Sequence, residues 1–535
     1  MPSLLTLHPR LTGLFLATTL RRHSSLSPLS RRLAFPISAA AARRQSSAAS
    51  TQSLDTTPND SPRPGRSGSL SSPPVYDSPQ RIDVNPPKGT RDFPPEEMRL
   101  RNWLFDNFRE VSRLFGFEEV DFPVLESEAL YIRKAGEEIR DQDRGNRRVA
   151  LRPELTPSLA RLVMQKGKSV SLPLKWFAVG QCWRYERMTR GRRREHYQWN
   201  MDIIGVPGVT AEAELISSIV TFFKRMGITS SDVGFKVSSR KVLQEVLMCY
   251  AIPENLFGKV CIIIDKFSTF MTLFDFINAI SGSDLQKFEL PEVLVVNSKA
   301  KNWKQMEKIP MDEIKKELKA AELSEEAIEE LLQVLSVKSL AQLEEKLGAA
   351  GEAIRDLKKL FSLAEKFGFS EWIQFDAAVV RGLAYYTGIV FEGFDREGKL
   401  RAICGGGRYD QLLSTFGGDN VPACGFGFGD AVIIELLKEK GLLPELSPLV
   451  ENIVCSLDHT LQGAAAAVAT ILREKGQSVD LVLENRPLKW VFKRAARINA
   501  RRLILVGSSE WQEGMVGVKI LSTGEQYEIK VDELK

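Results

Sequence analysis

The sequence predicts an α+β domain, in which helices flank an antiparallel sheet, together with a helical insertion and a C-terminal α/β domain. Two alternating segments, 174–186 and 195–205, are joined by a short loop and predict the antiparallel sheet through a hairpin. Residues 310–367 follow a helical pattern throughout and are rich in Glu and Lys, which predicts the insertion. After residue 451 strands and helices alternate, and this alternation is typical of a largely parallel sheet.

The individual helices and strands follow from local spacing. Apolar residues at helical intervals predict helices over 96–115, 155–164 and 211–226. A strand is expected over 118–125, at an edge or an interface, because Pro123 cannot donate a backbone hydrogen bond. The remaining expected elements are strands around 372–394 and 425–428, strand 453–457, helix 462–475, strand 479–483, helix 488–500 and strand 503–506.

These elements divide the chain into parts with different expected roles. The expected parts are a leader and linker over 1–80, a core over 81–235 and 370–440, a mainly helical insertion region over 236–369 in which 267–305 is atypical, and the C-terminal domain over 448–535.

The composition excludes several classes of protein. With 43% hydrophobic and 26% charged residues, the chain is neither wholly disordered nor collagen-like. No apolar run approaches the length of a transmembrane helix, so no contact with a membrane is expected. The 6 cysteines stand far apart without a C-x-x-C pair, which argues against a disulfide framework, and no metal site with zinc spacing is expected.

The positive charge of the chain is concentrated at its N-terminus. Residues 1–54 contain seven Arg and no Asp or Glu, which is typical of an organellar transit peptide, with a plain disordered tail as the alternative. Residues 56–79 are rich in Pro, Gly and Ser, as linkers are. Residues 1–80 carry nine Arg and three Asp, so the net charge of +5 falls to −1 without them.

The predicted hairpin presents a polar face. Alternation places Gly180, Cys182, Arg184 and Glu186 on one face of the first strand and Gln198, Asn200 and Asp202 on one face of the second. Such a face is either merely solvated or a substrate surface, on which Arg184 meets a phosphate and Gly180 lets a flat ring approach. The connecting loop favours the substrate surface, because 184–194 contains six Arg and a single acid.

Two glycine-rich segments are further candidates. The stretch Arg381-Gly-Leu-Ala-Tyr-Tyr-Thr-Gly388 sets two tyrosines beside an arginine, although adjacent aromatic residues are more often simple packing. The stretch Gly425-Phe-Gly-Phe-Gly429 alternates as a strand whose glycine face permits a ligand or another backbone to approach. Neither is a dinucleotide fingerprint or a P-loop.

A basic helix is expected in the C-terminal domain. Residues 486–502 contain seven basic residues and no acid, and Lys489, Lys493 and Arg497 recur on one helix face. Basic stripes often lack a partner, but an acid-free one favours nucleic-acid binding.

Four stretches together resemble the histidyl-tRNA synthetase family of class II aminoacyl-tRNA synthetases. They are Pro87-Lys-Gly-Thr-Arg-Asp-Phe93, Leu151-Arg-Pro-Glu-Leu-Thr156, Arg184-Tyr-Glu-Arg187 with Gln198, and Arg381-Gly-Leu-Ala-Tyr-Tyr386. The resemblance covers residues 82–535 and implies a class II catalytic core with a C-terminal anticodon-binding domain. It further implies L-histidine, ATP, Mg²⁺ and tRNA(His) as ligands, a homodimer, and a plant form of the chloroplast, the mitochondrion or both.

The resemblance implies a role for each matching residue. Arg184 and Arg381 would be catalytic, both at the ATP α-phosphate, with Arg184 also on the histidine carboxylate and Glu186 near the adenine. The stretch Glu154-Leu155-Thr156 with Gln198 would receive the histidine α-ammonium group, and Asp202 and Tyr386, with Tyr385 alongside, would contact the imidazole nitrogens. The tRNA contacts would be Arg187, Arg190, Arg192, Arg193, Arg194, Lys489 and Lys493. The strand around Pro123 would lie at the dimer interface.

The sequence also departs from the family pattern. Val432 stands where the family places an adenine-facing arginine. A strand near 141–143 is a few residues short, and 267–305 has no expected counterpart, which suggests a retained intron or an error in the gene structure. The alternative function is a non-catalytic paralogue that regulates histidine biosynthesis; the change at Val432 favours it, whereas Arg381 and the complete C-terminal domain speak against it. A generic RNA-binding protein would leave the tyrosine pair unexplained.

Overall fold

The computed structural model describes residues 83–131, 140–142, 147–185, 191, 193–253, 256–265, 308–347, 351–383, 385–446 and 450–534. The expected leader and linker over 1–80 and the atypical segment 267–305 lie outside these residues. So do the candidate site residues Glu186, Arg187, Arg190 and Arg192.

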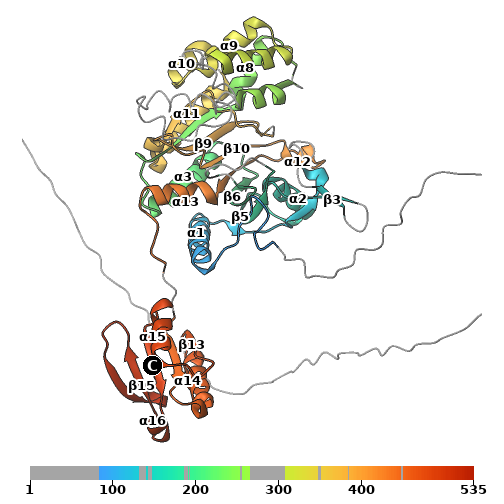
Figure 1. Ribbon diagram of the computed structural model, residues 1–535. Coiled ribbons are helices and arrows are strands. Elements are labelled where there is room, and N and C mark those ends of the chain that lie inside the picture. The colour runs from blue at the N-terminus through green and yellow to red at the C-terminus, as the bar shows by residue number, and fades with distance from the viewer. Residues whose placement is uncertain are drawn as a thin grey trace, which may run out of the picture. The chain divides into compact units, whose positions relative to one another are not determined.

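An eight-stranded sheet in the order β1-β5-β6-β11-β10-β9-β7-β8 forms the centre of the larger part of the chain, residues 83–446 (Figure 1). Its strands are β1 (Glu118–Glu119), β5 (Leu174–Trp183), β6 (Glu195–Ile204), β7 (Val233–Ser239), β8 (Ile373–Phe375), β9 (Ile389–Asp395), β10 (Cys404–Arg408) and β11 (Ala423–Gly429). Neighbouring strands pair antiparallel except at the two edges, where β1 joins β5 and β8 joins β7 in parallel. The predicted antiparallel sheet and its hairpin are therefore confirmed.

The strand expected over 118–125 is divided between two sheets. Its first two residues form β1 at the edge of the large sheet, as the proline predicted. Its end continues as β2 (Leu125–Ser127), which pairs with β4 (Arg148–Leu151) in a three-stranded sheet completed by β3 (Arg140–Gln142). The break occurs at Pro123. Beside it the main chain does not pair with another strand, because the buried Arg152 donates a hydrogen bond from Nη1 to Phe122 O at 2.6 Å.

The helices described in this larger part are α1 (Pro95–Leu114), α2 (Thr156–Lys166), α3 (Thr210–Arg225), α4 (Arg240–Cys249), α8 (Lys308–Ala320), α9 (Glu325–Leu335), α10 (Leu340–Leu347), α11 (Glu352–Phe367), α12 (Leu412–Thr415) and α13 (Asp430–Glu439). Helices α8 to α11 confirm the predicted helical insertion. Short 3₁₀ helices lie at Glu128–Leu130, Gly167–Ser169, Ser370–Trp372, His459–Leu461 and Val531–Glu533. None of the helices in the described ranges is both long and apolar enough to cross a bilayer.

The two faces of the large sheet carry different side chains. Trp199, Met201 and Ile203 of β6 pack with α1 and α3 in the main core, where Trp199 stacks on Phe108 at 4.7 Å. The opposite face of β6 carries the polar residues, and α2 and α12 pack on that side. The predicted alternation is confirmed, and it leaves the polar face available for a site.

The C-terminal domain has a sheet in the order β13-β12-β14-β15-β16. Strands β12 (Asn452–Ser456), β13 (Val479–Leu481) and β14 (Arg502–Val506) are parallel, whereas β15 (Met515–Ile520) and β16 (Gln526–Lys530) add an antiparallel edge that the sequence analysis did not predict. Helices α14 (Gln462–Glu474) and α15 (Leu488–Arg497) pack in separate cores on the two faces, and α16 (Ser508–Gln512) lies beside β15.

Candidate active site

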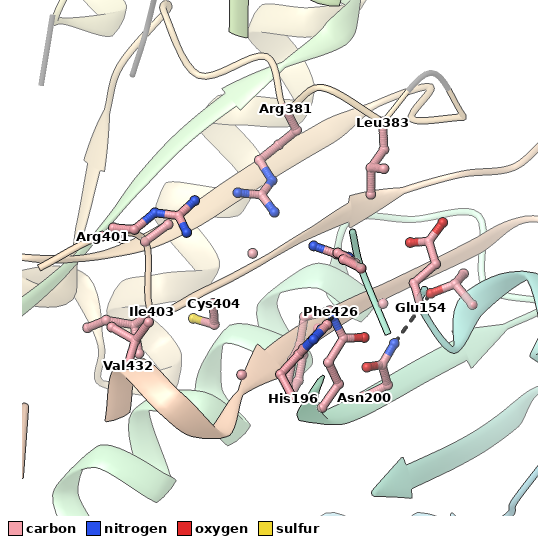
Figure 2. A pocket seen from close by; sticks show the side chains of 18 of the residues that line it. Glu154, His196, Asn200, Arg381, Leu383, Arg401, Ile403, Cys404, Phe426 and Val432 are labelled. Atoms are coloured by element: carbon pink, nitrogen blue, oxygen red, sulfur yellow. Dashed lines mark hydrogen bonds between the residues drawn. The ribbon is translucent and has the colours of Figure 1, made fainter. Parts of the chain in front are cut away.

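A cavity of about 230 Å³ lies on the polar face of the large sheet, lined by residues of β6, β10 and β11 (Figure 2). Its walls also include residues from the start of α2, from the loop before β9 and from the start of α13. The predicted site residues that line it are Glu154, Thr156, Arg184, Arg193, Gln198, Arg381, Tyr385 and Tyr386. The fold thus brings together segments that are more than two hundred positions apart in the sequence.

The glycines of β11 form an open floor for this cavity. Gly425, Gly427 and Gly429 pair with Asp202, Asn200 and Gln198 of β6, so glycines and polar side chains share one face. A Cβ atom at Gly429 would meet nothing within 4 Å, and at Gly427 the nearest atom would be 3.5 Å away. This floor leaves room for a ligand, as the alternating glycines predicted.

Gly180, in contrast, does not make room for a flat ring, and that expectation was wrong. A Cβ atom there would lie 2.6 Å from Arg152 Nη2 and 2.9 Å from Leu155 Cδ2. The buried Arg152 donates hydrogen bonds to main-chain carbonyl groups, so the space above Gly180 holds a structural arginine. The side chain of Leu155 packs in the core, and only its neighbours Glu154 and Thr156 line the cavity.

One end of the cavity carries acceptors for a positively charged group. The Tyr385 hydroxyl donates a hydrogen bond to Glu154 Oε2 at 3.1 Å, and Asn200 Nδ2 donates to Thr156 Oγ1 at 3.3 Å. Burial, with the charge of Glu154 second, raises the pKa of Tyr385 well above its ordinary value, so Tyr385 remains a donor. The buried Asn200 Oδ1 has no hydrogen-bond partner among the described residues. A carboxylate and a free amide oxygen together suit an ammonium group.

Asp202 lies beneath this end, next to the floor. The Tyr409 hydroxyl, which the sequence analysis did not select, donates a hydrogen bond to Asp202 Oδ1. Gly425 must lack a side chain here, because a Cβ atom would lie 1.9 Å from the same oxygen. Burial is the main cause that raises the pKa of Asp202 to about 7, which is near the ordinary pKa of an imidazole.

The other end of the cavity is cationic, and Arg381 is at its centre. The Arg381 guanidinium lies against β10, where a Cβ atom on Gly405 would be 2.4 Å from Cζ. Arg381 Nη1 is 3.0 Å from Glu392 Oε2, whereas its buried Nε has no partner among the described residues. Arg381 has a left-handed φ of 56°, and Arg240 Nη2 holds this conformation by donating to Arg381 O at 2.6 Å.

The start of α13 closes the cationic end. Asp430 is buried, accepts a hydrogen bond from the Tyr197 N–H at 3.0 Å and forms a 2.7 Å salt bridge with Arg91. Val432 lines the cavity, so the departure from the family pattern falls inside the site. Arg193, which we expected to contact tRNA, also lines the cavity.

Other predicted residues are not part of the cavity lining. Arg194 packs over the Tyr185 ring at 4.3 Å, and Lys489 and Lys493 are exposed on α15. Among the lining residues that the sequence analysis did not select are His196, Tyr409 and Arg401. The alternation of β6 could have selected His196, since it shares a face with Gln198, but no sequence signal pointed to Arg401.

Solved structures place this architecture in a known class. The chain is similar to histidyl-tRNA synthetase from Nostoc sp. PCC 7120, with a TM-score of 0.61 and 23% identity over 84% of this chain and 98% of that one. It is also similar to the ATP phosphoribosyltransferase regulatory subunit/histidyl-tRNA synthetase of Bacillus halodurans, with a TM-score of 0.59 and 21% identity over 81% of this chain and 100% of that one. The chain therefore has the class II aminoacyl-tRNA synthetase fold.

Sequence comparison narrows the class to a family. Residues 89–268 and 272–430 match the family described as histidyl-tRNA synthetase, and residues 446–535 match the anticodon binding domain. The chain is 73% identical over 478 residues to histidine--tRNA ligase, chloroplastic/mitochondrial, of Arabidopsis thaliana, covering 88% of this chain and 90% of that protein. It is 34% identical over 458 residues to histidine--tRNA ligase of Opitutus terrae, covering 84% and 96%. The chain belongs to the histidyl-tRNA synthetase family. The match includes 272–305, which does not favour our interpretation of that segment as foreign to the family.

Proposed function

We propose that the chain activates L-histidine with ATP to histidyl-adenylate, releases diphosphate, and transfers the histidine to tRNA(His) in the chloroplast, the mitochondrion or both. The observation that carries this proposal is a cavity with an ammonium-accepting end and an arginine-rich end over one glycine floor. The identity to the Arabidopsis enzyme supports the reaction and the organelles, and the acid-free leader agrees with import.

In this proposal the ammonium-accepting end positions the amino acid. Glu154, Thr156 and Gln198 receive the α-ammonium group, and Asp202 and Tyr386 contact the imidazole nitrogens. The Asp202 carboxylate can accept an imidazole N–H, and Tyr386 keeps its proton because burial raises its pKa to about 12. A pocket that pairs both polar edges of the imidazole rejects amino acids that lack them, because its own buried polar groups would then stay unpaired.

At the arginine-rich end the proposed chemistry is an in-line displacement. A histidine carboxylate oxygen attacks the α-phosphorus of ATP, the bond from the α-phosphorus to the bridging oxygen breaks, and diphosphate leaves with that oxygen. Arg184 and Arg381 stabilise the charge that develops on the α-phosphate, a task that needs fixed positive charge rather than a base. The salt bridge with Glu392 and the close approach to the main chain at Gly405 hold the Arg381 guanidinium in place before the substrate binds.

Mg²⁺ is proposed to bind together with ATP. The residues that the structure describes contain no group of three or more His, Cys, Asp or Glu placed to hold a metal ion. Because Mg²⁺ is often held largely by substrate phosphates, this arrangement fits an ion bound mainly by ATP. The ion would neutralise phosphate charge.

The remaining expectations are also proposals. The arginines of 187–194 contact the acceptor stem of tRNA, and the domain over 448–535 binds the anticodon. We further propose a homodimer that uses the segment around Pro123, between β1 and β2, where Leu125 is exposed. Sedimentation of the full chain at the mass of one protomer would exclude the dimer.

Histidine-dependent exchange of diphosphate into ATP tests the function. The full chain should catalyse the exchange with L-histidine but not with histidinol or other amino acids, since only histidine offers both a carboxylate and an imidazole. Purified tRNA(His) should then be charged. Absence of exchange by folded protein would support the non-catalytic paralogue instead.

A further inference from the structure

The arginine-rich end of the cavity lacks an arginine at position 432, yet it contains one from another segment. We propose that Arg401, in the connection between β9 and β10, binds the β- and γ-phosphates of ATP. This inference rests on the proposed function and names a phosphate-positioning residue within it.

Arg401 stands where it can reach a ligand beside Val432. Arg401, Ile403 and Val432 all line the cavity, although the first two come from the strand connection and the third from α13. Figure 2 shows Arg401 on the same side as Ile403 and Val432, with its guanidinium directed toward that of Arg381. Glu154 and Asn200 lie at the opposite side of the same view. Arg401 is therefore at the nucleotide end and not at the amino-acid end.

Arg401 has no salt-bridge partner among the residues of the described ranges. Arg381, in contrast, is paired with Glu392, and Arg91 is paired with Asp430. Arg401 is exposed where it lines the cavity, so its guanidinium is accessible to a ligand there. A guanidinium without a carboxylate partner can pair with an anion that binds beside it.

The phosphates of ATP are the anion that fits. ATP with three phosphates carries about four negative charges, more than Arg184 and Arg381 can balance at the α-phosphate. The β- and γ-phosphates must lie farther from the amino-acid end, on the side of the cavity that Arg401 and Val432 line (Figure 2). A guanidinium also matches the paired oxygens of a phosphate, which makes the contact directional.

Arg401→Ala and Arg401→Lys in the full chain test the inference. Arg401→Ala should raise the KM for ATP in the exchange assay about tenfold or more, as expected for the loss of a charge-assisted hydrogen bond. Arg401→Lys should raise this KM less, because the lysine keeps the positive charge. The KM for histidine should stay within about twofold of wild type. Lys399→Ala is the matched control, because Lys399 lies in the same connection, does not line the cavity and pairs with Glu397 at 2.5 Å.

A second ligand distinguishes the phosphates from the adenosine. A non-hydrolysable histidyl-adenylate analogue lacks the β- and γ-phosphates, so its inhibition constant should be the same for Arg401→Ala and wild type. An ATP KM within about twofold of wild type, or an equal loss of affinity for ATP and the analogue, would overturn the inference.

Calorimetric titration of ATP in the absence of histidine separates this inference from the proposed function. If wild type showed no exchange, the function would fail, whereas weaker ATP binding by Arg401→Ala would still support the phosphate contact.

Discussion

The Tyr409 hydroxyl donates a hydrogen bond to the carboxylate of Asp202, and both side chains are almost completely buried. Burial raises the pKa of Asp202 from its ordinary value of 3.8 to about 7, so the folded protein without substrate holds the proton more tightly than the unfolded chain. The stabilisation that this protonation provides is therefore complete below pH 4 and is lost as the pH rises through 7.

Asp202→Asn should remove this pH dependence. Relative to wild type, the thermal midpoint of the variant without histidine should rise progressively from pH 5 to pH 8, because wild type must then bury a carboxylate. Scanning calorimetry at each pH measures the difference. Saturating histidine should stabilise wild type more than the variant at pH 8, since the imidazole provides a hydrogen-bond donor for the carboxylate. A difference between the midpoints that is constant with pH would contradict the raised pKa.

Arg381→Ala should abolish adenylate formation while tRNA binding stays nearly unchanged. The loss in the exchange rate should be about 10²-fold or more, because a fixed charge at the reacting phosphate acts mainly on the transition state. Arg396→Ala is the control, since Arg396 lies at the end of β9 and bonds to Ser230 O at 2.6 Å outside the cavity. Filter binding of labelled tRNA measures the second property. Unchanged exchange would refute the role of Arg381.

Gly405→Ala should lower activity because it displaces Arg381. The new Cβ atom would lie 2.4 Å from Arg381 Cζ, so the guanidinium must move from its position beside Glu392. We expect a fall in kcat of about tenfold or more, with the far-ultraviolet circular dichroism unchanged. Gly208→Ala, where a Cβ atom would meet nothing within 4 Å, should leave the rate unaltered. Equal rates for the two variants would mean that the close contact does not position Arg381.

Glu212→Ala should destabilise the catalytic domain strongly. Both side chains of the Glu212–Arg408 pair are buried, and two contacts join them, Nε to Oε1 at 2.6 Å and Nη2 to Oε2 at 2.7 Å. Removing the acid leaves a buried guanidinium without its carboxylate, at a cost of about 3–5 kcal/mol in the free energy of unfolding. Glu110→Ala breaks an exposed pair with Arg113 and should change the urea midpoint little. A small shift in the urea midpoint of Glu212→Ala would show that Asp410 can replace Glu212 as the partner of Arg408.

Local spacing predicted those parts of the fold and site that depend on one segment alone. The two faces of β6 followed from alternation, because only the distance between neighbouring residues matters there. The pairing of Gly425 with Asp202 could not be derived, since it depends on which strands become neighbours. The room above Gly180 was predicted wrongly because the size of a residue says nothing about which side chain, here Arg152, fills the space.

Lys489→Ala with Lys493→Ala should weaken tRNA binding without affecting adenylate formation. Both lysines are exposed on α15, and the neighbouring exposed Trp490 ring has Arg486 and Arg494 within 5.7 Å, a combination typical of single-stranded nucleic-acid binding. The KM for tRNA(His) should rise about tenfold, and the slope of log affinity against log salt should decrease by about 2, because two phosphate contacts are lost. Arg473→Ala on α14 is the matched control, since α14 packs on the opposite face of the same sheet and Arg473 is exposed. An unchanged salt slope in the double variant would exclude phosphate contacts by this helix, whatever the change in KM.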